Sequence, residues 1–343
     1  MPRSDDPRPP PPRASGDPAS PGAPPAGLAA VAIGRNEGDR LRACLASLAG
    51  RVERIVYVDS GSSDGSVALA RAFGAEVVAL DMDRPFTAAR ARNAGLAALP
   101  GAGIELVQFL DGDCALQPGW LPAARAFLRE RPACGAVCGR RRERHPEASV
   151  FNMLCDLEWD TPPGEARACG GDALMRVEAL RAVGGFREDL IAGEEPELCV
   201  RLRAAGWTIW RLEREMTLHD AAMTRPSQWW RRARRGGYAF AEGAFLHGAP
   251  PERHWVRETR RAIAWGALLP AGAVAGALAL TPWALLLLLA YPLQVLRLAG
   301  RAGRAGRLAA LFHVLAKFPE ALGALEFHAR RRIGRRAALI EYK

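Results

Sequence analysis

Short apolar segments alternate with segments of helical spacing in the first third of the chain, and this alternation constrains the fold more than any other feature. Four apolar runs have the length and composition of buried strands, at residues 28–33, 55–58, 76–80 and 104–110. Helical patterns separate them, the first marked by Leu41, Leu45 and Leu48. Strands that alternate with helices predict an α/β fold with a right-handed, mostly parallel sheet.

Acidic residues follow three of these strands, at Glu37, Asp59 and Asp111. The carboxyl ends of parallel strands share one edge of a sheet, and ligands of open α/β sheets bind there. We therefore expect the three carboxylates to gather along one edge. The glycine-rich signatures of a dinucleotide site and of a P-loop are both absent from the sequence.

The fourth apolar run ends at Asp111-Gly112-Asp113. In extended backbone the side chains of Asp111 and Asp113 point the same way, so both can face one hard cation, and Gly112 permits a ligand to approach the backbone. The alternative is a pair of turn-forming aspartates before the next helix. A nucleotide diphosphate that meets carboxylates needs a divalent cation, which this pair would hold.

The sequence resembles the family 2 glycosyltransferases over roughly residues 28 to 225. Seven elements carry the resemblance by their order and spacing: Arg35-Asn36-Glu37, Val58-Asp59-Ser60-Gly61-Ser62-Ser63-Asp64-Gly65, Arg90-Ala91-Arg92-Asn93, Asp111-Gly112-Asp113, Gly170-Gly171-Asp172, Gly184-Gly185-Phe186 and Gly193-Glu194-Glu195. The resemblance implies a GT-A fold for residues 27–225 and a nucleotide-sugar donor.

The resemblance also implies roles for the residues that bind the donor. Asp59 would bind the nucleotide base, and Glu37 would lie beside the ribose or base. Asp111 and Asp113 would hold Mg²⁺ or Mn²⁺ on the donor diphosphate, where the metal stabilises the leaving group. Arg92 would lie near the donor. The alternatives are a turn former for Asp59, a helix cap for Glu37 and a solvated helix face for Arg92.

Further candidates lie downstream. The family usually has Glu-Asp where this chain has Glu194-Glu195, so Glu195 would be the catalytic base, with Glu194 as a possible substitute; the alternative is an acid-rich helix start. Asp172, in an expected strand, would contact donor or acceptor, and the glycines before it could instead mark a bulge. His219, expected in a loop, is a candidate third metal ligand or a structural histidine.

A strongly apolar segment without charge runs from residue 262 to Arg297, and Thr281-Pro282 divides it into two stretches close to the length of a membrane span. Arginines flank both sides, which favours a hairpin at residues 262–299 with both ends cytoplasmic. A re-entrant segment and a buried helical pair remain alternatives. The hairpin predicts localisation at the cytoplasmic face of the cell membrane.

The regions around this segment are basic. The net charge is +10, and most of the excess arginine follows residue 225, which favours an anionic membrane surface over nucleic acid as the partner. We expect basic and aromatic interfacial helices at 226–261 and a basic amphipathic tail at 300–343, with a helix near 308–327. Residues 1–26 read as a disordered proline-rich tail. The seven scattered cysteines predict reduced, mostly buried thiols in the cytosol.

Together these features predict an inverting glycosyltransferase. It would move one sugar from a nucleotide-sugar donor to an acceptor, a lipid-linked glycan, at the cytoplasmic membrane face. The Gln228-Trp229-Trp230-Arg231-Arg232 segment only partly matches the signature of processive polysaccharide synthases, which argues against a self-secreting polymerase. Two alternatives remain, a non-catalytic membrane scaffold with a nucleotide-binding fold and a sugar nucleotidyltransferase.

Overall fold

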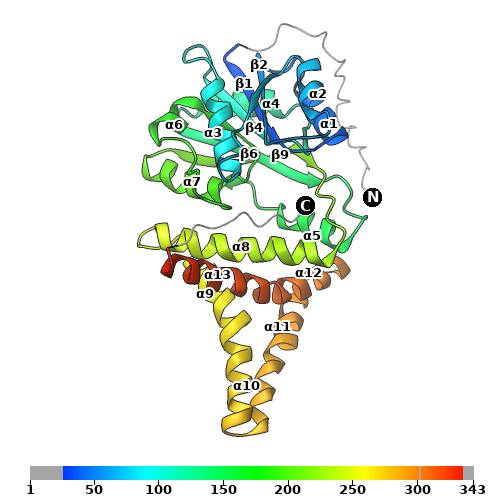
Figure 1. Ribbon diagram of the computed structural model, residues 1–343, viewed down its shortest axis with the longest axis vertical. Coiled ribbons are helices and arrows are strands. Elements are labelled where there is room, and N and C mark those ends of the chain that lie inside the picture. The colour runs from blue at the N-terminus through cyan, green and yellow to red at the C-terminus, as the bar shows by residue number, and fades with distance from the viewer. Residues whose placement is uncertain (1–25, 301–302, 335–343) are drawn as a thin grey trace, which may run out of the picture.

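The computed structural model describes residues 26–300 and 303–334 in three tiers (Figure 1). An α/β domain forms the first tier. Helices α8, α12 and α13 cross beneath it as a second tier, and a helical hairpin projects away from them as the third. The predicted tail at residues 1–26 lies almost wholly outside the described residues, as do Arg301, Arg335 and Arg336 of the basic regions.

The first half of the α/β domain is the predicted parallel sheet. Its strands lie in the order β3-β2-β1-β4, and every neighbouring pair is parallel. The elements are β1 (Leu28–Gly34), α1 (Asp39–Leu48), β2 (Arg54–Asp59), α2 (Ser66–Ala72), β3 (Glu76–Ala79), α3 (Ala88–Ala98) and β4 (Leu106–Asp111). Gly34 pairs with Asp59, and Ile33 pairs with Asp111, so the expected gathering of strand ends at one edge is confirmed.

The second half of the sheet is mixed. Beyond β4 the order is β8-β6-β9-β5, in which only β6 and β9 are parallel, and β7 pairs with β9. The elements are β5 (Cys114–Leu116), α4 (Trp120–Glu130), β6 (Cys134–Glu143), α5 (Val150–Glu158), β7 (Gly164–Glu165), β8 (Ala173–Arg176), α6 (Val177–Ala182), α7 (Glu194–Ala204) and β9 (Thr208–His219).

Two local expectations are wrong here. Gly170, Gly171 and Asp172 lie in a loop that ends where β8 begins, because Gly170 takes a positive φ of 94° that interrupts an extended strand. His219 is the last residue of β9 and not a loop residue, since β9 stays paired with β5 and β6 up to that position.

The core is apolar on both faces of the central strands. Val31, Val58 and Phe109 are fully buried. Helix α3 packs so closely on β1 that a Cβ at Gly95 would lie 2.3 Å from Cγ1 of Val31, so the helix needs glycine there. All seven cysteines are free thiols, and all but Cys169 are buried, as predicted for their packing.

The second tier contains α8 (Pro226–His247), α12 (Arg304–Leu315) and α13 (Lys317–Arg332). Glycines bring α8 and α13 into close contact, because a Cβ at Gly237 would lie 2.0 Å from the carbonyl oxygen of Glu320, and one at Gly323 would lie 2.0 Å from that of Arg234. The single amphipathic helix expected at 308–327 is instead two helices, which meet at Ala316.

The third tier is the predicted hairpin. One arm is continuous through α9 (Val256–Ile263), a π-helical turn η1 (Ala264–Leu268) and α10 (Leu269–Ala279); the other consists of η2 (Pro282–Leu289) and α11 (Ala290–Ala299). The arms Val256–Ala279 and Pro282–Ala299 are long and apolar enough to cross a membrane, with mean hydropathies of 1.7 and 1.5. A third candidate, Ala305–Arg332, lies across the hairpin base (Figure 1).

The hairpin arms are hardly covered by protein. Only 11% of the apolar window of the first arm and none of the second is buried. Leu278 and Leu280 near the tip are 85% and 86% exposed. The alternative of a buried helical pair is therefore wrong. Exposed apolar surface of this extent marks a membrane or protein contact, so the hairpin is compatible with membrane association.

Candidate active site

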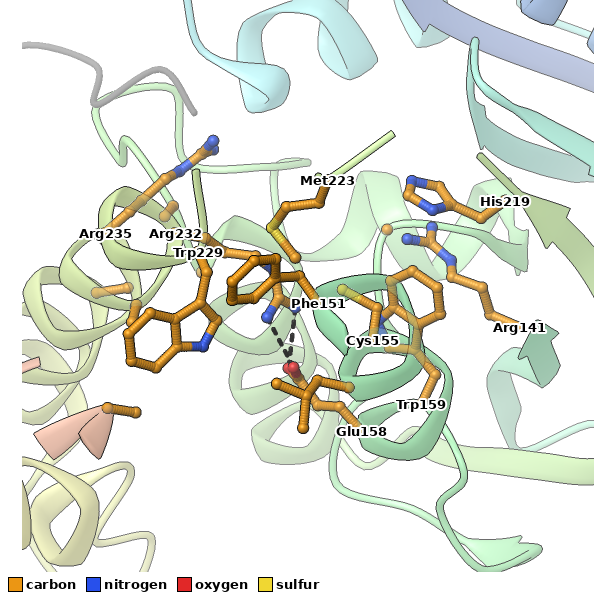
Figure 2. A pocket seen from close by; sticks show the side chains of 18 of the residues that line it. Arg141, Phe151, Cys155, Glu158, Trp159, His219, Met223, Trp229, Arg232 and Arg235 are labelled. Carbon is orange, nitrogen blue, oxygen red and sulfur yellow. Dashed lines mark hydrogen bonds and ion pairs between the residues drawn. The ribbon is translucent and has the colours of Figure 1, made fainter. Parts of the chain in front are cut away.

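One cavity of about 1410 Å³ joins the edge of the sheet to the second tier. Glu37, Asp111, Asp113 and Glu194 line its sheet end. Its middle passes the side chains that Figure 2 labels, among them Trp159 and Arg232. Its far end is lined by residues of α9, α11, α12 and α13. The cavity therefore connects the predicted donor edge with the helices at the hairpin base.

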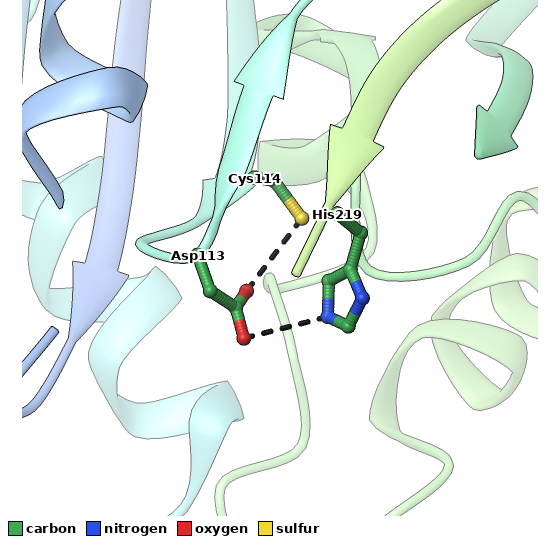
Figure 3. A group of neighbouring side chains, drawn as sticks. All are labelled: Asp113, Cys114 and His219. Carbon is green, nitrogen blue, oxygen red and sulfur yellow. Dashed lines mark hydrogen bonds and ion pairs between the residues drawn. The ribbon is translucent and has the colours of Figure 1, made fainter. Parts of the chain in front are cut away.

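Asp113 and His219 face each other across the turn after β4 (Figure 3). Nε2 of His219 lies 3.4 Å from Oδ2 of Asp113, and both side chains are buried. Nδ1 of His219 lies 3.5 Å from Oε2 of Glu143, and the ring of Trp159 packs edge-on at 4.8 Å. The imidazole is thus held between two carboxylates, with its orientation fixed by an aromatic ring.

Asp111 points instead toward two arginines. Its Oδ1 lies 2.8 Å from Nη2 of Arg92, and its Oδ2 lies 3.4 Å from Nη2 of Arg141. Arg92 also donates to Oε1 of Glu194 at 2.6 Å. Burial disfavours the charged form of Arg92, but Asp111 and Glu194 outweigh it and raise the pKa of the guanidinium. Arg92 is only 2% exposed, so the solvated-face alternative for it is wrong.

Asp172 holds this arrangement from behind. Its Oδ1 accepts the backbone N–H of Asp111 at 3.1 Å, and its Oδ2 accepts the hydroxyl of Thr217 at 2.8 Å. The same Oδ2 lies 2.7 Å from Nη2 of Arg141. Asp172 is buried and does not line the cavity, so it ties β4, β6 and β9 together.

The two glutamates at the start of α7 have different surroundings. Glu194 lines the cavity, whereas Glu195 is 2% exposed and does not. The Glu195 carboxylate accepts the backbone N–H groups of Cys169 at 2.6 Å and Gly170 at 2.8 Å, and the thiol of Cys199 at 2.8 Å. Burial raises the pKa of Glu195, although these hydrogen bonds oppose the rise. Glu195 therefore fixes the loop before Asp172.

The remaining predicted donor residues lie at the same edge. Glu37 lines the cavity and forms an ion pair with Arg40 at 2.9 Å. Asp59 stands at the end of β2 but accepts hydrogen bonds from its own turn, from the N–H groups of Gly61 at 3.1 Å and Ser62 at 2.9 Å. Asp59 thus acts as a turn former in this structure and does not line the cavity.

Two site residues were missed at the sequence level, Arg141 and Glu143 on β6. They alternate with Arg140 and Arg142, which both reach Asp156. Alternation along a strand places Arg141 and Glu143 on the opposite face, beside Asp111 and His219. The run of five consecutive charged residues at 140–144 was the signal that could have revealed them.

The donor set at Asp113 and His219 fits a divalent cation. A carboxylate oxygen and an imidazole nitrogen suit Mn²⁺. Glu143 supplies the carboxylate behind the histidine that commonly orients such ligands. Asp113, Cys114 and His219 form one group with potential ligand atoms within 4.8 Å of one another, and Asp111 belongs to a different group with Cys114 and Asp172. The structure thus brings two of the three predicted metal ligands together and turns Asp111 toward the arginines.

Comparison with known proteins identifies the domain. Residues 31–184 match the family model described as glycosyl transferase family 2. The chain contains a family 2 glycosyltransferase domain. It is 27% identical over 189 residues to the succinoglycan biosynthesis protein ExoA of Rhizobium meliloti, covering 51% of this chain and 57% of that protein. It is 30% identical over 194 residues to the pre-mycofactocin glycosyltransferase of Mycobacterium tuberculosis, covering 50% of this chain and 38% of that protein.

A solved structure extends the similarity beyond this family 2 domain. The mannosyltransferase PcManGT from Pyrobaculum calidifontis, in complex with GDP-Man and Mn²⁺, is 21% identical and superposes with a TM-score of 0.60 over 88% of this chain and 87% of that chain. The fold is therefore GT-A, followed by C-terminal helices apolar enough for membrane association. The chain spans less than two thirds of the length of either curated relative.

Proposed function

We propose that the protein is an inverting, metal-dependent glycosyltransferase that moves a sugar from a nucleotide-sugar donor to a lipid-linked acceptor at the cytoplasmic face of the membrane. The observation that carries the proposal is the single cavity that runs from the acidic sheet edge to the helices at the base of the apolar hairpin. A donor enters from the aqueous side, and an acceptor anchored in the bilayer enters from the other.

The sheet end of the cavity would bind the donor. Asp113 and His219 would hold Mg²⁺ or Mn²⁺, which supplies charge stabilisation for the departing nucleoside diphosphate. The similar PcManGT structure contains GDP-Man and Mn²⁺, which supports a donor and a metal of this class. Arg92 and Arg141 hold Asp111 in place, and both guanidinium groups would be available to the charge of a diphosphate bound beside Asp111. Glu37 would contact the nucleoside from the turn after β1, and Asp59 would hold the turn beside it in shape.

The proton of the acceptor hydroxyl would pass to the Glu194–Glu195 pair. Glu194 is the member with access to the cavity, and its Oε2 accepts no hydrogen bond from the described part of the chain. Glu195 would position this helix start by fixing the loop at Cys169 and Gly170. Attack from the face opposite the leaving diphosphate, in a single displacement, inverts the anomeric configuration.

The proposed orientation at the membrane rests on the hairpin. The first arm leaves the second tier and the second arm returns to it (Figure 1). The α/β domain and both ends of the hairpin would therefore stay on one side of the bilayer. Nine arginines in the described segments at 225–261 place positive charge at that level: Arg225, Arg231, Arg232, Arg234, Arg235, Arg253, Arg257, Arg260 and Arg261. Positive charge beside an apolar hairpin favours the cytoplasmic face.

The test uses the full chain reconstituted in nanodiscs that contain a membrane lipid extract. Radiolabelled UDP, GDP, dTDP and CMP sugars are supplied with Mn²⁺, with Mg²⁺ or with EDTA. We expect metal-dependent transfer of label to the lipid phase, lost in Asp113→Ala and retained in Asp39→Ala, which removes an exposed carboxylate outside the cavity. Nucleotide binding without transfer from any donor would refute the enzyme and favour a scaffold.

A second comparison separates the two glutamates. Glu194→Gln is expected to lower kcat at unchanged donor binding, because it removes the proton acceptor that reaches the cavity. Glu195→Gln keeps an oxygen for the loop amides and is expected to lower kcat less. The reverse order of the two losses would assign the base to Glu195.

A further inference from the structure

The membrane end of the cavity contains a cluster of basic side chains. Arg261 comes from α9, His313 from α12 and Lys317 from the start of α13, and all three line the cavity. They lie close to one another, since the charges of Lys317 and Arg261 both act on the imidazole of His313. Three helices that are separate in sequence thus bring three hydrogen-bond donors to one place.

The charges around this cluster are only partly neutralised. Lys317 donates to Glu320 at 2.5 Å, and Arg232, further along the cavity, forms a bidentate pair with Glu158. Arg261 forms no ion pair or hydrogen bond with the described residues, and Nζ of Lys317 has two further protons to donate. Glu258 also lines this end, one turn before Arg261. The cluster therefore keeps donors that can bind an anion.

The walls beside the cluster are apolar. Leu298 at the end of α11 and Ala309, Ala310 and Phe312 of α12 line the same end of the cavity. Leu298 belongs to the hairpin, so the apolar wall continues onto the surface that would face lipid. A group that fits here carries negative charge on one side and an alkyl chain on the other.

We propose that Arg261, His313 and Lys317 bind the phosphate of a lipid phosphate, and that this phosphate is the anchoring group of the acceptor. Three donors from three directions match the several acceptor oxygens of a phosphoryl group better than one carboxylate. The assignment rests on the proposed glycosyltransferase function, and it narrows the acceptor to a saccharide linked to lipid through phosphate.

The placement assigns the phosphate a positioning role. The cluster lies at the opposite end of the cavity from Asp113 and Glu194, so the phosphate takes no part in the sugar transfer. Loss of the cluster should raise the acceptor KM and leave kcat and donor binding nearly unchanged.

The test measures binding of dodecyl phosphate by the full chain in detergent micelles, followed by tryptophan fluorescence, with dodecanol and inorganic phosphate as parallel ligands. We expect the double variant Arg261→Gln, Lys317→Gln and the single variant His313→Leu, which removes the donor, to weaken dodecyl phosphate binding at least tenfold. Arg260→Gln is the matched control, because Arg260 is an exposed arginine of the same helix that does not line the cavity. The conservative variant Arg261→Lys should retain most of the dodecyl phosphate binding.

Several outcomes would overturn the proposal. If dodecanol binds as tightly as dodecyl phosphate, the cluster is not a phosphate site. If inorganic phosphate binds as tightly as dodecyl phosphate, the ligand is not a lipid. An equal loss of dodecyl phosphate binding in Arg260→Gln would show that general surface charge, and not this cluster, causes the loss. Unchanged thermal unfolding and unchanged Mn²⁺-dependent nucleotide binding show that a variant is folded. If lipid phosphate binds as expected but no donor sugar is transferred, the phosphate site stands and the proposed enzymatic function fails.

Discussion

Arg92 is the side chain on which the geometry of the site most depends, and its replacement gives the sharpest prediction. Arg92→Met keeps an unbranched apolar side chain in the same space but removes the guanidinium. The variant loses the contact to Asp111 at 2.8 Å and the contact to Glu194 at 2.6 Å. The carboxylates of Asp111 and Glu194 would then remain without the buried cation that both of them contact.

The size of the effect follows from the exposure of the partners. Removal of one member of a fully buried ion pair costs about 3–5 kcal/mol. Here Arg92 is 3% exposed in its side chain, but Asp111 is 31% exposed and keeps Arg141, whereas Glu194 is 13% exposed. We therefore expect the free energy of unfolding to fall by an amount near the lower limit, about 3 kcal/mol. For a domain of this size that corresponds to a fall in Tm of roughly 6–12 °C.

The assay is thermal unfolding in detergent micelles, followed by intrinsic fluorescence, for Arg92→Met, Arg92→Lys and Arg84→Met. Lysine keeps the charge but cannot bridge both carboxylates, so the loss of stability in Arg92→Lys should be intermediate. Arg84 pairs with Glu188 at 3.4 Å, and both side chains are exposed, so its loss should stay below about 1 kcal/mol. An Arg92→Met variant as stable as Arg84→Met would refute the view that this guanidinium holds the site together.

Three further predictions concern other parts of the molecule. Glu143→Gln should weaken Mn²⁺ binding about 10–100-fold, measured by calorimetry with nucleotide present, because it removes the carboxylate that orients His219; unchanged affinity would show that Glu143 does not orient a metal ligand. Burial and the charge of Asp189 raise the pKa of Glu242 to about 7, so its ionised form destabilises the fold above that pH and the penalty disappears as the pH falls toward 4.5. Glu242→Gln should therefore stabilise the protein by about 2 kcal/mol at pH 8, allowing for partial exposure, and by nothing measurable near pH 4.5, with Tm compared at both values. Replacing Leu286 and Leu287 by arginine should cost about 3 kcal/mol or more per site for insertion and shift the protein out of the membrane fraction in flotation; full retention would show that the hairpin is not inserted.

The parallel half of the sheet was predictable because its signals are local. Each strand from β1 to β4 is a short apolar run, and the acids after β1, β2 and β4 are fixed to the strand ends by sequence alone. The mixed half was not predictable, because β6, β8 and β9 pair across long stretches of chain and their charged positions hide the strand pattern.

The same distinction applies to the site. The sequence places Asp111 and Asp113 together at one strand end, but the direction in which each carboxylate points depends on partners far along the chain. Arg92 and Arg141 draw Asp111 to one side, and His219 lies beside Asp113 on the other. The role of Glu195 likewise depends on the loop at Cys169 and Gly170, about 25 residues earlier, and that of Glu194 depends on Arg92.

The stacking of α8 on α13 sets the distance between the acidic sheet edge and the base of the apolar hairpin. The hairpin leaves from beneath these two helices, while the acidic sheet edge lies above them (Figure 1). Two stacked helices separate the two levels by a distance on the order of 20 Å. Under the proposed function, a lipid-linked acceptor would have to present its hydroxyl at that height, so the thickness of the helical tier would set a minimum headgroup length. Shorter headgroups would be excluded by distance alone, whatever their chemistry.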